Sequence, residues 1–281
     1  MSQDFQKSYQ KSGYLTDAYR FFHLKDTSLR SFDFHYHDFH KILLFLSGNT
    51  SYIVEGRLYE LQPGDVLLIP AGEIHKPQNH GGAVYERMIL YISEEFLQQN
   101  STPDTDLAYC FRQAAASACN LLRTGAEERY ALLGSVADQL PEVFSSDEYG
   151  SDLYRSLKVQ ELLLVLGRLL STSGDLSIST TTHPTVLAIM NYINDHITED
   201  LSIERIAGHM FLNRSYAMHL FKAETGYTIG KYITKKRLFL AGQYRKQGLS
   251  VTESCFLSGF KNYSAFYHAE KGQRDSGFSN E

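Results

Sequence analysis

The chain has 281 residues, 43% of them hydrophobic and 21% charged, which is the composition of an ordinary soluble protein with room for two domains. No apolar run approaches the ~18 residues that a membrane span needs, and the polar start Met1–Asp4 lacks the core of a secretory signal. The cysteines Cys110, Cys119 and Cys255 form an odd, dispersed set, which favours reduced thiols over a disulfide framework. These observations predict a cytoplasmic protein with no membrane partner.

The net charge of −5 is distributed unevenly along the chain. Residues 1–183 carry −8 and residues 184–281 carry +3, and the segment from Arg205 to Lys271 holds 11 basic but only 3 acidic side chains. A basic block within an otherwise acidic chain indicates a polyanionic partner for that block. A solvated helical surface is the alternative, but it does not by itself explain the contrast.

Residues 1–100 read as short strands, rich in aromatic and β-branched residues and separated by Gly and Pro. The expected strands are 19–24, 31–37, 42–47, 52–54, 58–61, 66–69 and 85–92. Many short strands with such turns predict a small sandwich or barrel.

Residues 101–171 change to a helical pattern, with helices expected at 103–123, 127–144 and 152–170. Pro141 is expected to disturb the end of the second helix. The third helix has more leucines than one apolar stripe can bury. These leucines are Leu157, Leu162, Leu163, Leu164, Leu166, Leu169 and Leu170. We favour a homodimer interface for this helix, with packing against the strands as the alternative.

Residues 172–184 form a Ser/Thr-rich linker, and residues 185–281 read as helical. Two copies of a short helix, a turn and a second helix begin at Leu201 and Leu249, and a long helix at 228–244 joins them. Ser250 and Glu253 form a capping box in the second copy. A doubled helix-turn-helix of this kind fits the major groove of double-stranded DNA.

Small residues in the first helix of each copy, Ala207 and Cys255, let the two helices cross closely. The second helix of each copy then supplies the candidate contacts to bases. The candidate base contacts are Arg214, Ser215, Met218 and His219 in the first copy and Tyr263, Ser264, Tyr267 and His268 in the second. The candidate phosphate contacts are Asn213, Lys222, Lys235, Lys236 and Lys261. A helical bundle with an incidentally basic face is the alternative.

A set of short motifs runs through both copies and the joining helix. It comprises Leu201-Ser202, Ile206-Ala207, Leu220-Phe221-Lys222, Thr225-Gly226, Arg237-Leu238, Ala241, Ser250, Glu253, Gly259-Phe260, Ser264 and Phe266. With these motifs, residues 184–272 resemble the DNA-binding domain of the AraC/XylS family of transcription regulators. The resemblance implies two recognition helices in successive major-groove segments.

The chain departs from the family pattern in three respects. His219 and His268 replace the usual base-contacting arginine, Glu270 replaces a core aromatic, and the segment after Lys271 differs from the family's closing segment. We therefore expect the first copy and the joining helix to provide most of the DNA affinity.

The strand region carries His35-Tyr36-His37 with Gly48, followed by Gly64, Pro70, Gly72, His75 and Asn79. This pattern resembles the cupin-like sensor domain common in the family. His35 and His37 point to the same face of a strand, so with His75 they form one possible set of metal ligands. However, Lys41 stands where the motif has a carboxylate, and its charge repels a divalent metal. We therefore predict no metal and no cofactor, and a pocket lined by His35, His37, Lys41 and His75 for a sugar-like or anionic effector.

The predicted fold class is α+β, with a cupin-like β-barrel (1–100), a helical dimerisation segment (101–171), a linker (172–184) and an all-α double helix-turn-helix domain (185–281). The predicted function is a homodimeric, effector-controlled transcription regulator rather than an enzyme, with RNA polymerase as a further partner. One alternative is a metal-dependent cupin enzyme with an accessory DNA-binding tail. Another is a regulator that senses no small molecule.

Overall fold

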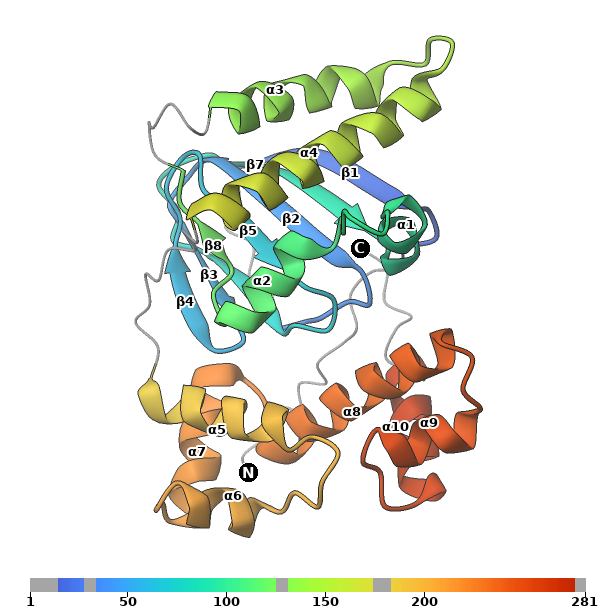
Figure 1. Cartoon of the computed structure of the whole chain (residues 1–281). Helices are drawn as coiled ribbons and strands as arrows, with labels where there is room; N and C mark the ends of the chain where they lie inside the picture. Colours follow the sequence, from blue (N-terminus) through green and yellow to red (C-terminus); the bar gives the residue numbers. More distant parts are fainter. Residues whose placement is uncertain (1–14, 28–33, 125–130, 174–182, 276–281) are drawn as a thin grey trace.

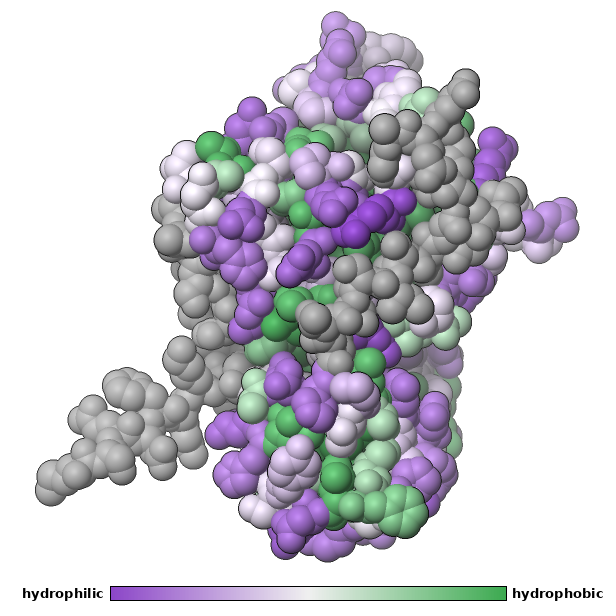
Figure 2. Space-filling view, turned by 90° about the vertical axis from the view of Figure 1, so that its left-hand side faces the viewer, coloured by the Kyte–Doolittle hydropathy of each residue, from purple (hydrophilic) through white to green (hydrophobic). Residues whose placement is uncertain are grey.

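The computed structural model describes residues 15–27, 34–124, 131–173 and 183–275. An N-terminal part of two antiparallel sheets with flanking helices lies above an all-helical C-terminal part (Figure 1). This arrangement confirms the predicted α+β class. Seen from the side where α5 lies in Figure 1, hydrophobic residues gather at the junction of the two parts (Figure 2).

The described strands form a five-stranded sheet in the order β1-β7-β2-β5-β8 and a three-stranded sheet in the order β4-β3-β6. Their bounds are β1 Tyr19–Asp26, β2 His40–Ser47, β3 Thr50–Val54, β4 Arg57–Glu60, β5 Val66–Ile69, β6 His75–Asn79, β7 Tyr85–Ile92 and β8 Leu121–Leu122. Strand β2 is buried on both faces: Ile42 and Leu44 face the helices, whereas Leu43 and Phe45 face the space between the sheets. This explains why the strand reads as a continuous apolar run.

Four helices accompany the sheets in the described part of the chain, and α2, α3 and α4 belong to the layer over the five-stranded sheet (Figure 1). They are α1 Glu94–Asn100, α2 Tyr109–Ser117, α3 Ala131–Ser145 and α4 Ser151–Ser173. In α4, Leu162, Leu163, Leu166 and Leu170 are buried in this layer. Leu153, Leu157 and Leu164 stay exposed, so packing against the sheet accounts for only part of the leucine-rich surface.

Several sequence expectations on the N-terminal part were wrong. The helix expected at 103–123 is shorter: it is α2, which is followed by Ala118 in a left-handed conformation. Leu121 and Leu122 then pair with β5, and each side chain is buried in a different hydrophobic core. The helix expected at 127–144 is α3, which ends at Ser145, close to the expected end. Pro141 was expected to disturb this end but lies inside the helix, and Val143 after it is buried in the core. Strand β6 was missed. The expected strand 31–37 lies partly outside the described residues, and its described end forms only an isolated bridge between His35 and His75.

The C-terminal part contains the two predicted helix-turn-helix units joined by one long helix, α8. Its helices are α5 Pro184–Asp195, α6 Ile203–His209, α7 Arg214–Thr225, α8 Ile229–Lys246, α9 Val251–Leu257 and α10 Tyr263–Asp275. The first unit has a large core shared with α5 and α8, whereas the second has a small core of Ala241, Cys255, Phe260 and Phe266. The predicted linker falls mostly on residues 174–182, outside the described residues. Among the described helices, none has the length and apolar character of a membrane span.

Arg237 of α8 fixes the two units relative to each other. Its guanidinium donates to the carbonyl oxygens of Ile197 (2.9 Å) and Glu199 (2.6 Å), in the connection between α5 and α6. The turn of the second unit packs against the same connection at Gly259, where a Cβ atom would lie 2.7 Å from the Ile197 oxygen. Gly259 also has a φ of 93°, so both its conformation and its surroundings require glycine.

The N-terminal part and the first unit share one core through two extended segments. Phe34 and Tyr36 on one segment and Ile74 on the other are buried with Val186, Ile189 and other apolar residues of α5 to α8. The phenol of Tyr227 donates to the carbonyl oxygen of Phe34 at 3.1 Å. On the β5–β6 turn, Gly72 packs so closely on Phe239 of α8 that a Cβ atom there would lie 2.8 Å from the ring.

Glu55 is the polar centre of this interface. Its carboxylate accepts from the Ile74 amide and from Lys236 of α8, both at 2.8 Å, and from the phenol of Tyr232. The turn that carries it packs against α5 and α7 at Gly56. One buried side chain thus connects the sheet with two residues of α8, and removing one partner of such a group is costly.

Glu73 lies near Glu55, and its carboxylate accepts a hydrogen bond from the Asn120 side chain at 2.6 Å. Burial, followed by repulsion from Glu55, raises the pKa of Glu73 from 4.5 to about 8. The folded protein therefore retains this proton over a pH range in which the unfolded chain has lost it.

We expect Glu73→Gln to change how stability depends on pH. Because the folded pKa exceeds the unfolded value, the contribution of Glu73 is fully present below pH 4.5 and is lost as pH rises to about 8. The free energy of unfolding of the variant should lack this decline, measured by urea titration between pH 4.5 and 8. The exposed Glu95→Gln serves as control, and equal pH dependence in both variants would contradict the assignment.

Gly259→Ala should destabilise the protein more than Gly248→Ala. Both glycines have a φ of 93°, but a Cβ atom at Gly248 meets open space. Gly248→Ala should therefore lower the free energy of unfolding only by the strain of a left-handed alanine, about 1–2 kcal/mol. Gly259→Ala should lower it by a further ~1–3 kcal/mol, because the added Cβ atom overlaps its neighbours. Urea unfolding measures both, and equal losses would show that the close approach at Gly259 is unimportant.

Candidate nucleic-acid interface and histidine cluster

The first recognition helix, α7, begins at a capped N-terminus. The side chain of Asn213 accepts from the Ser215 amide at 2.8 Å, and Ala217 and Phe221 anchor the inner face. Arg214, Ser215 and His219 are exposed on the outer face, and Met218 is half-buried. Three of the four predicted base contacts of the first copy are therefore accessible, whereas Met218 packs against the core of the first unit.

The second recognition helix, α10, repeats this design 49 residues later. The side chain of Asn262 accepts from the Ala265 amide at 2.8 Å, and Phe266 anchors the inner face. Tyr263, Ser264, Tyr267 and His268 are all exposed. Asn262 was missed in the sequence analysis, although its alignment with Asn213 between the two copies could have revealed it.

Glu270 replaces the expected core aromatic without leaving a buried charge unpaired. It forms an ion pair with Arg245 of α8, and the rings of Phe260 and Phe266 pack edge to face at 5.2 Å beside it. An ion pair therefore holds α10 against α8 at this position. At the equivalent position of the first copy, the buried Phe221 makes an apolar contact instead.

The predicted phosphate contacts fall into two groups. Lys222 and Lys261 are exposed, and Lys261 pairs with Asp200 at 2.5 Å between two side chains that are each 65% exposed. Exposed pairs of this kind contribute little to stability, so a phosphate can replace the carboxylate.

Lys235 and Lys236 do not lie where the sequence analysis placed them. Lys235 lies over the rings of Tyr36 (4.5 Å) and Tyr227 (4.9 Å), and burial lowers its pKa to about 8. Lys236 is paired with Glu55. Both belong to the interface between the two parts of the protein, so in this arrangement neither faces a nucleic acid.

The predicted histidines converge on one site. Paired backbone hydrogen bonds of 3.0 and 2.9 Å join His35 to His75, and the ring of His75 lies 4.4 Å from that of His35 and 4.8 Å from that of His37. His37 and His75 are 2% and 0% exposed. The side chains of His37 and His75 are thus closed off from solvent, whereas His35 is half-buried. Tyr52, Tyr59 and Tyr85 fill the interior between the sheets.

The protonation of His37 and His75 follows from their partners. Each Nδ1 lies within 2.9 Å of a backbone carbonyl oxygen, that of Phe39 or Glu73, and must donate to it. Burial, together with the nearby Lys41 and His35, holds both pKa values well below 6.5, so the rings are neutral. Each Nε2 is therefore a buried acceptor with no hydrogen-bond partner.

Lys41 lies beside the histidines as predicted. It is buried, and its ammonium donates to the phenol of Tyr52 at 2.9 Å. Within the described residues, no group of three or more His, Cys, Asp or Glu side chains is disposed to hold a metal ion. Two neutral acceptors next to one ammonium suit hydroxyl groups and an anionic group better than a cation.

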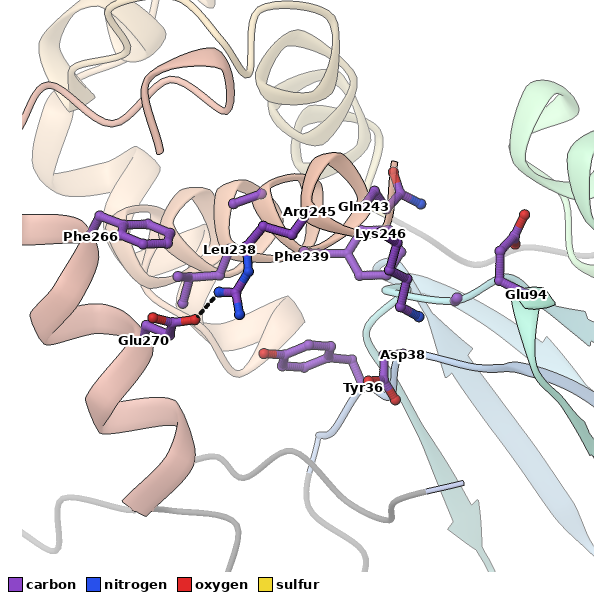
Figure 3. A pocket seen from close by; sticks show the side chains of 13 residues that line it. Tyr36, Asp38, Glu94, Leu238, Phe239, Gln243, Arg245, Lys246, Phe266 and Glu270 are labelled. Carbon is purple, nitrogen blue, oxygen red and sulfur yellow. Dashed lines mark hydrogen bonds and ion pairs between the residues drawn. The ribbon is translucent and has the colours of Figure 1, made fainter. Parts of the chain in front are cut away.

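A cleft of about 560 Å³ separates the N-terminal part from the second unit (Figure 3). Tyr36 and Asp38 lie on one side of it, and Phe239 and Lys246 of α8 lie on another. The sheets thus contact the first unit directly, whereas the second unit faces them across open space.

Two family models match the chain. The first, described as the AraC-like ligand binding domain, covers residues 19–163, and the second, described as a helix-turn-helix domain, covers residues 206–273. Together they span the sheets with their helices and both helical units.

Among curated proteins, the chain is similar to the probable transcriptional regulator LumQ of Photobacterium leiognathi, with 25% identity over 254 residues, 87% of this chain and 89% of that protein. It is also similar to the transcriptional activator RhaS of Shigella sonnei, with 23% identity over 83% of this chain and 81% of that protein. Among solved structures, ToxT from Vibrio cholerae is 17% identical with a TM-score of 0.36, covering 92% of this chain and 95% of that one.

Proposed function

Because the chain belongs to the AraC family of transcription regulators, we propose that a small molecule at the histidine cluster controls how its two helix-turn-helix units engage DNA. The observation that carries this proposal is the pair of buried, unpartnered Nε2 acceptors of His37 and His75. Unsatisfied buried polar atoms are rare in folded proteins, and a ligand that donates hydrogen bonds would satisfy both.

The proposed effector is a small hydroxylated molecule, sugar-like or carrying an anionic group. Hydroxyl groups can donate to the two Nε2 atoms, and the buried ammonium of Lys41 offers a partner for a carboxylate or a further hydroxyl. His35, which bridges to His75, is the fourth proposed ligand contact. The burial of His37 and His75 implies that the site opens before the effector reaches them.

The proposed signal passes through the two extended segments. Along the first, Phe34 and Tyr36 lie in the core of the first unit, whereas His35 and His37 lie in the histidine cluster. Along the second, Ile74 lies in the core of the first unit and His75 lies in the histidine cluster. Because alternate side chains of an extended segment point to opposite sides, movement of the histidines also moves the residues that hold the DNA-binding part.

The proposed DNA contacts are the accessible residues of both units and of the turn before α10. They are Asn213, Arg214, Ser215, Met218, His219, Lys222, Lys261, Tyr263, Ser264, Tyr267 and His268. The basic side chains and the capped helix ends supply sequence-independent contacts to phosphates, and the outer faces supply contacts to bases.

We further propose that two copies pair through the exposed side of α3 and α4, in residues 101–171. Leu153, Leu157 and Leu164 of α4 are exposed, as is Leu132 of α3. Sedimentation velocity at micromolar concentration distinguishes a dimer from a monomer. RNA polymerase is a further proposed partner, and the proposed site of action is the cytoplasm, where the DNA lies.

The comparisons give no support to the alternative of a metal-dependent enzyme, because the matched domains and relatives are those of transcription regulators. A regulator without an effector offers no ligand to the two Nε2 acceptors, and a buried acceptor left without a hydrogen bond costs stability. The effector-controlled function accounts for these atoms.

His37→Ala and His75→Ala should each abolish the thermal stabilisation that an effector produces. The probes are a panel of hexoses, sugar acids and polyols, and a probe at 100 times its dissociation constant stabilises by about 2.7 kcal/mol. Differential scanning fluorimetry measures the shift in melting temperature for the wild type and both variants. His80→Ala, which alters a histidine at the far end of β6, should retain the full shift. Absence of any shift across the panel in the wild type would contradict a sugar-like effector.

Lys222→Gln should weaken DNA binding and reduce its salt dependence. Loss of one phosphate contact lowers the slope of log K against log salt by about 1. Fluorescence anisotropy with a DNA duplex between 50 and 300 mM NaCl measures the slope. Lys25→Gln, a change at an exposed position of β1, serves as control and should behave as the wild type. An unchanged slope in Lys222→Gln would remove this residue from the interface.

A further inference from the structure

The outer face of the second recognition helix has an unusual composition for a DNA-reading surface. From Tyr263 to Glu270 it contains no lysine or arginine, although Lys261 precedes this segment and Lys271 follows it. The commonest specific contact in the major groove is an arginine or lysine that binds guanine with two hydrogen bonds. The central part of this helix cannot make that contact.

Besides His268, which replaces the usual arginine, two tyrosines are exposed on this outer face. Tyr263 and Tyr267 are 45% and 50% exposed, and their rings stack with centroids 6.5 Å apart and planes inclined by 21°. The buried Phe266 supports the Tyr263 ring from below, with centroids 5.9 Å apart. The two rings therefore form an exposed aromatic ridge at the start of α10.

The position of this ridge distinguishes it from ordinary surface tyrosines such as Tyr154 on α4. It begins at the first residue of the helix, directly after the Asn262 cap, where the free backbone amides favour a phosphate. Lysines lie before and after it. A phosphate-binding helix end, flanking cations and an apolar centre together match a surface that enters a DNA groove.

The chemistry of the major groove identifies what such a ridge reads. The 5-methyl group of thymine is the apolar group that the four bases present there, and aromatic and methyl-bearing side chains contact it. Residues four apart on a helix are separated by roughly 6 Å along its axis, close to the ~6.8 Å of two base-pair steps. The ridge can therefore contact thymines at two nearby positions.

We propose that Tyr263 and Tyr267 make the second helix-turn-helix unit a reader of thymine methyl groups. This inference rests on the proposed DNA-binding function and names the bases that one unit recognises. The first unit differs because its outer face carries Arg214, whose exposed pair with Glu204 leaves it available for guanine. The recognised DNA therefore has two unlike halves, with thymines in the half read by α10.

The test begins with selection of duplexes from a random pool by the full-length protein. A second selection with Tyr267→Ala locates the half-site of the second unit, as the positions that lose their preference. In the selected duplex, each thymine of that half is then replaced by deoxyuridine, which removes only the 5-methyl group. Fluorescence anisotropy at constant salt gives the dissociation constants.

For the wild type, each methyl group that contacts the ridge should account for an approximately fourfold change in affinity. Tyr267→Ala should bind the thymine and deoxyuridine duplexes equally at the affected position, whereas Tyr267→Phe, which retains the ring, should still distinguish them. Tyr154→Ala, an equally exposed tyrosine outside the DNA-binding part, should behave as the wild type.

Equal affinity of the wild type for the thymine and deoxyuridine duplexes would overturn the proposal, as would a second half-site composed of G·C pairs. In either case, selection of a defined duplex would still uphold DNA binding. If no duplex is enriched and binding shows no salt dependence, the DNA-binding function itself is wrong, and the thymine proposal fails with it.

Discussion

The arrangement of this protein depends on alternation along two short extended segments. His35 and His75 are joined by a pair of backbone hydrogen bonds, which holds the segments together. One side carries the buried imidazoles of His37 and His75, and the other carries Phe34, Tyr36 and Ile74 in the core of the first helix-turn-helix unit. Because an extended backbone places neighbouring side chains on opposite sides, the proposed ligand site and the DNA-binding part are separated by one layer of peptide. Neither can be repacked without affecting the other, since close-packed interiors transmit displacement rather than absorb it.

A second constraint acts within the DNA-binding part. Arg237 donates to two carbonyl groups of the α5–α6 connection, and Gly259 lets the turn of the second unit approach the same connection. The two recognition helices are thereby held at a fixed separation, although the second unit has only a small hydrophobic core. A fixed separation means that DNA must adapt its bend and twist to the protein, so the deformability of the sequence between the half-sites contributes to recognition.

The sequence predicted the parts of this structure that depend on local pattern. Short-range spacing predicted the doubled helix-turn-helix, the capping box at Ser250 and the Gly259 turn. It also predicted most of the strands and the convergence of His35, His37 and His75. The missed features depend on distant partners. Leu121 and Leu122 become a strand because β5 offers an open edge, and Pro141 remains within a helix because tertiary packing outweighs its local cost. Lys235 and Lys236 look like phosphate ligands in a basic helix, yet they meet Tyr36 and Glu55, some 180 or more residues away in the chain. No spacing rule within α8 could reveal those partners.

These constraints also define how an effector can act. In this arrangement the imidazoles of His37 and His75 are sealed, and Glu55 closes the interface through Tyr232 and Lys236. In the proposed function, an effector that enters must displace side chains on the histidine side of the segments, and the shared core carries that displacement to α8. By thermodynamic linkage, DNA that favours one position of α8 must alter effector affinity by the same factor. The sign of this coupling depends on which position of α8 brings both recognition helices into register with DNA. The first unit is packed on the sheets, and Arg237 and Gly259 hold the second unit to the first. A displacement of α8 therefore moves both recognition helices together, and the cleft beside the second unit leaves space for that movement.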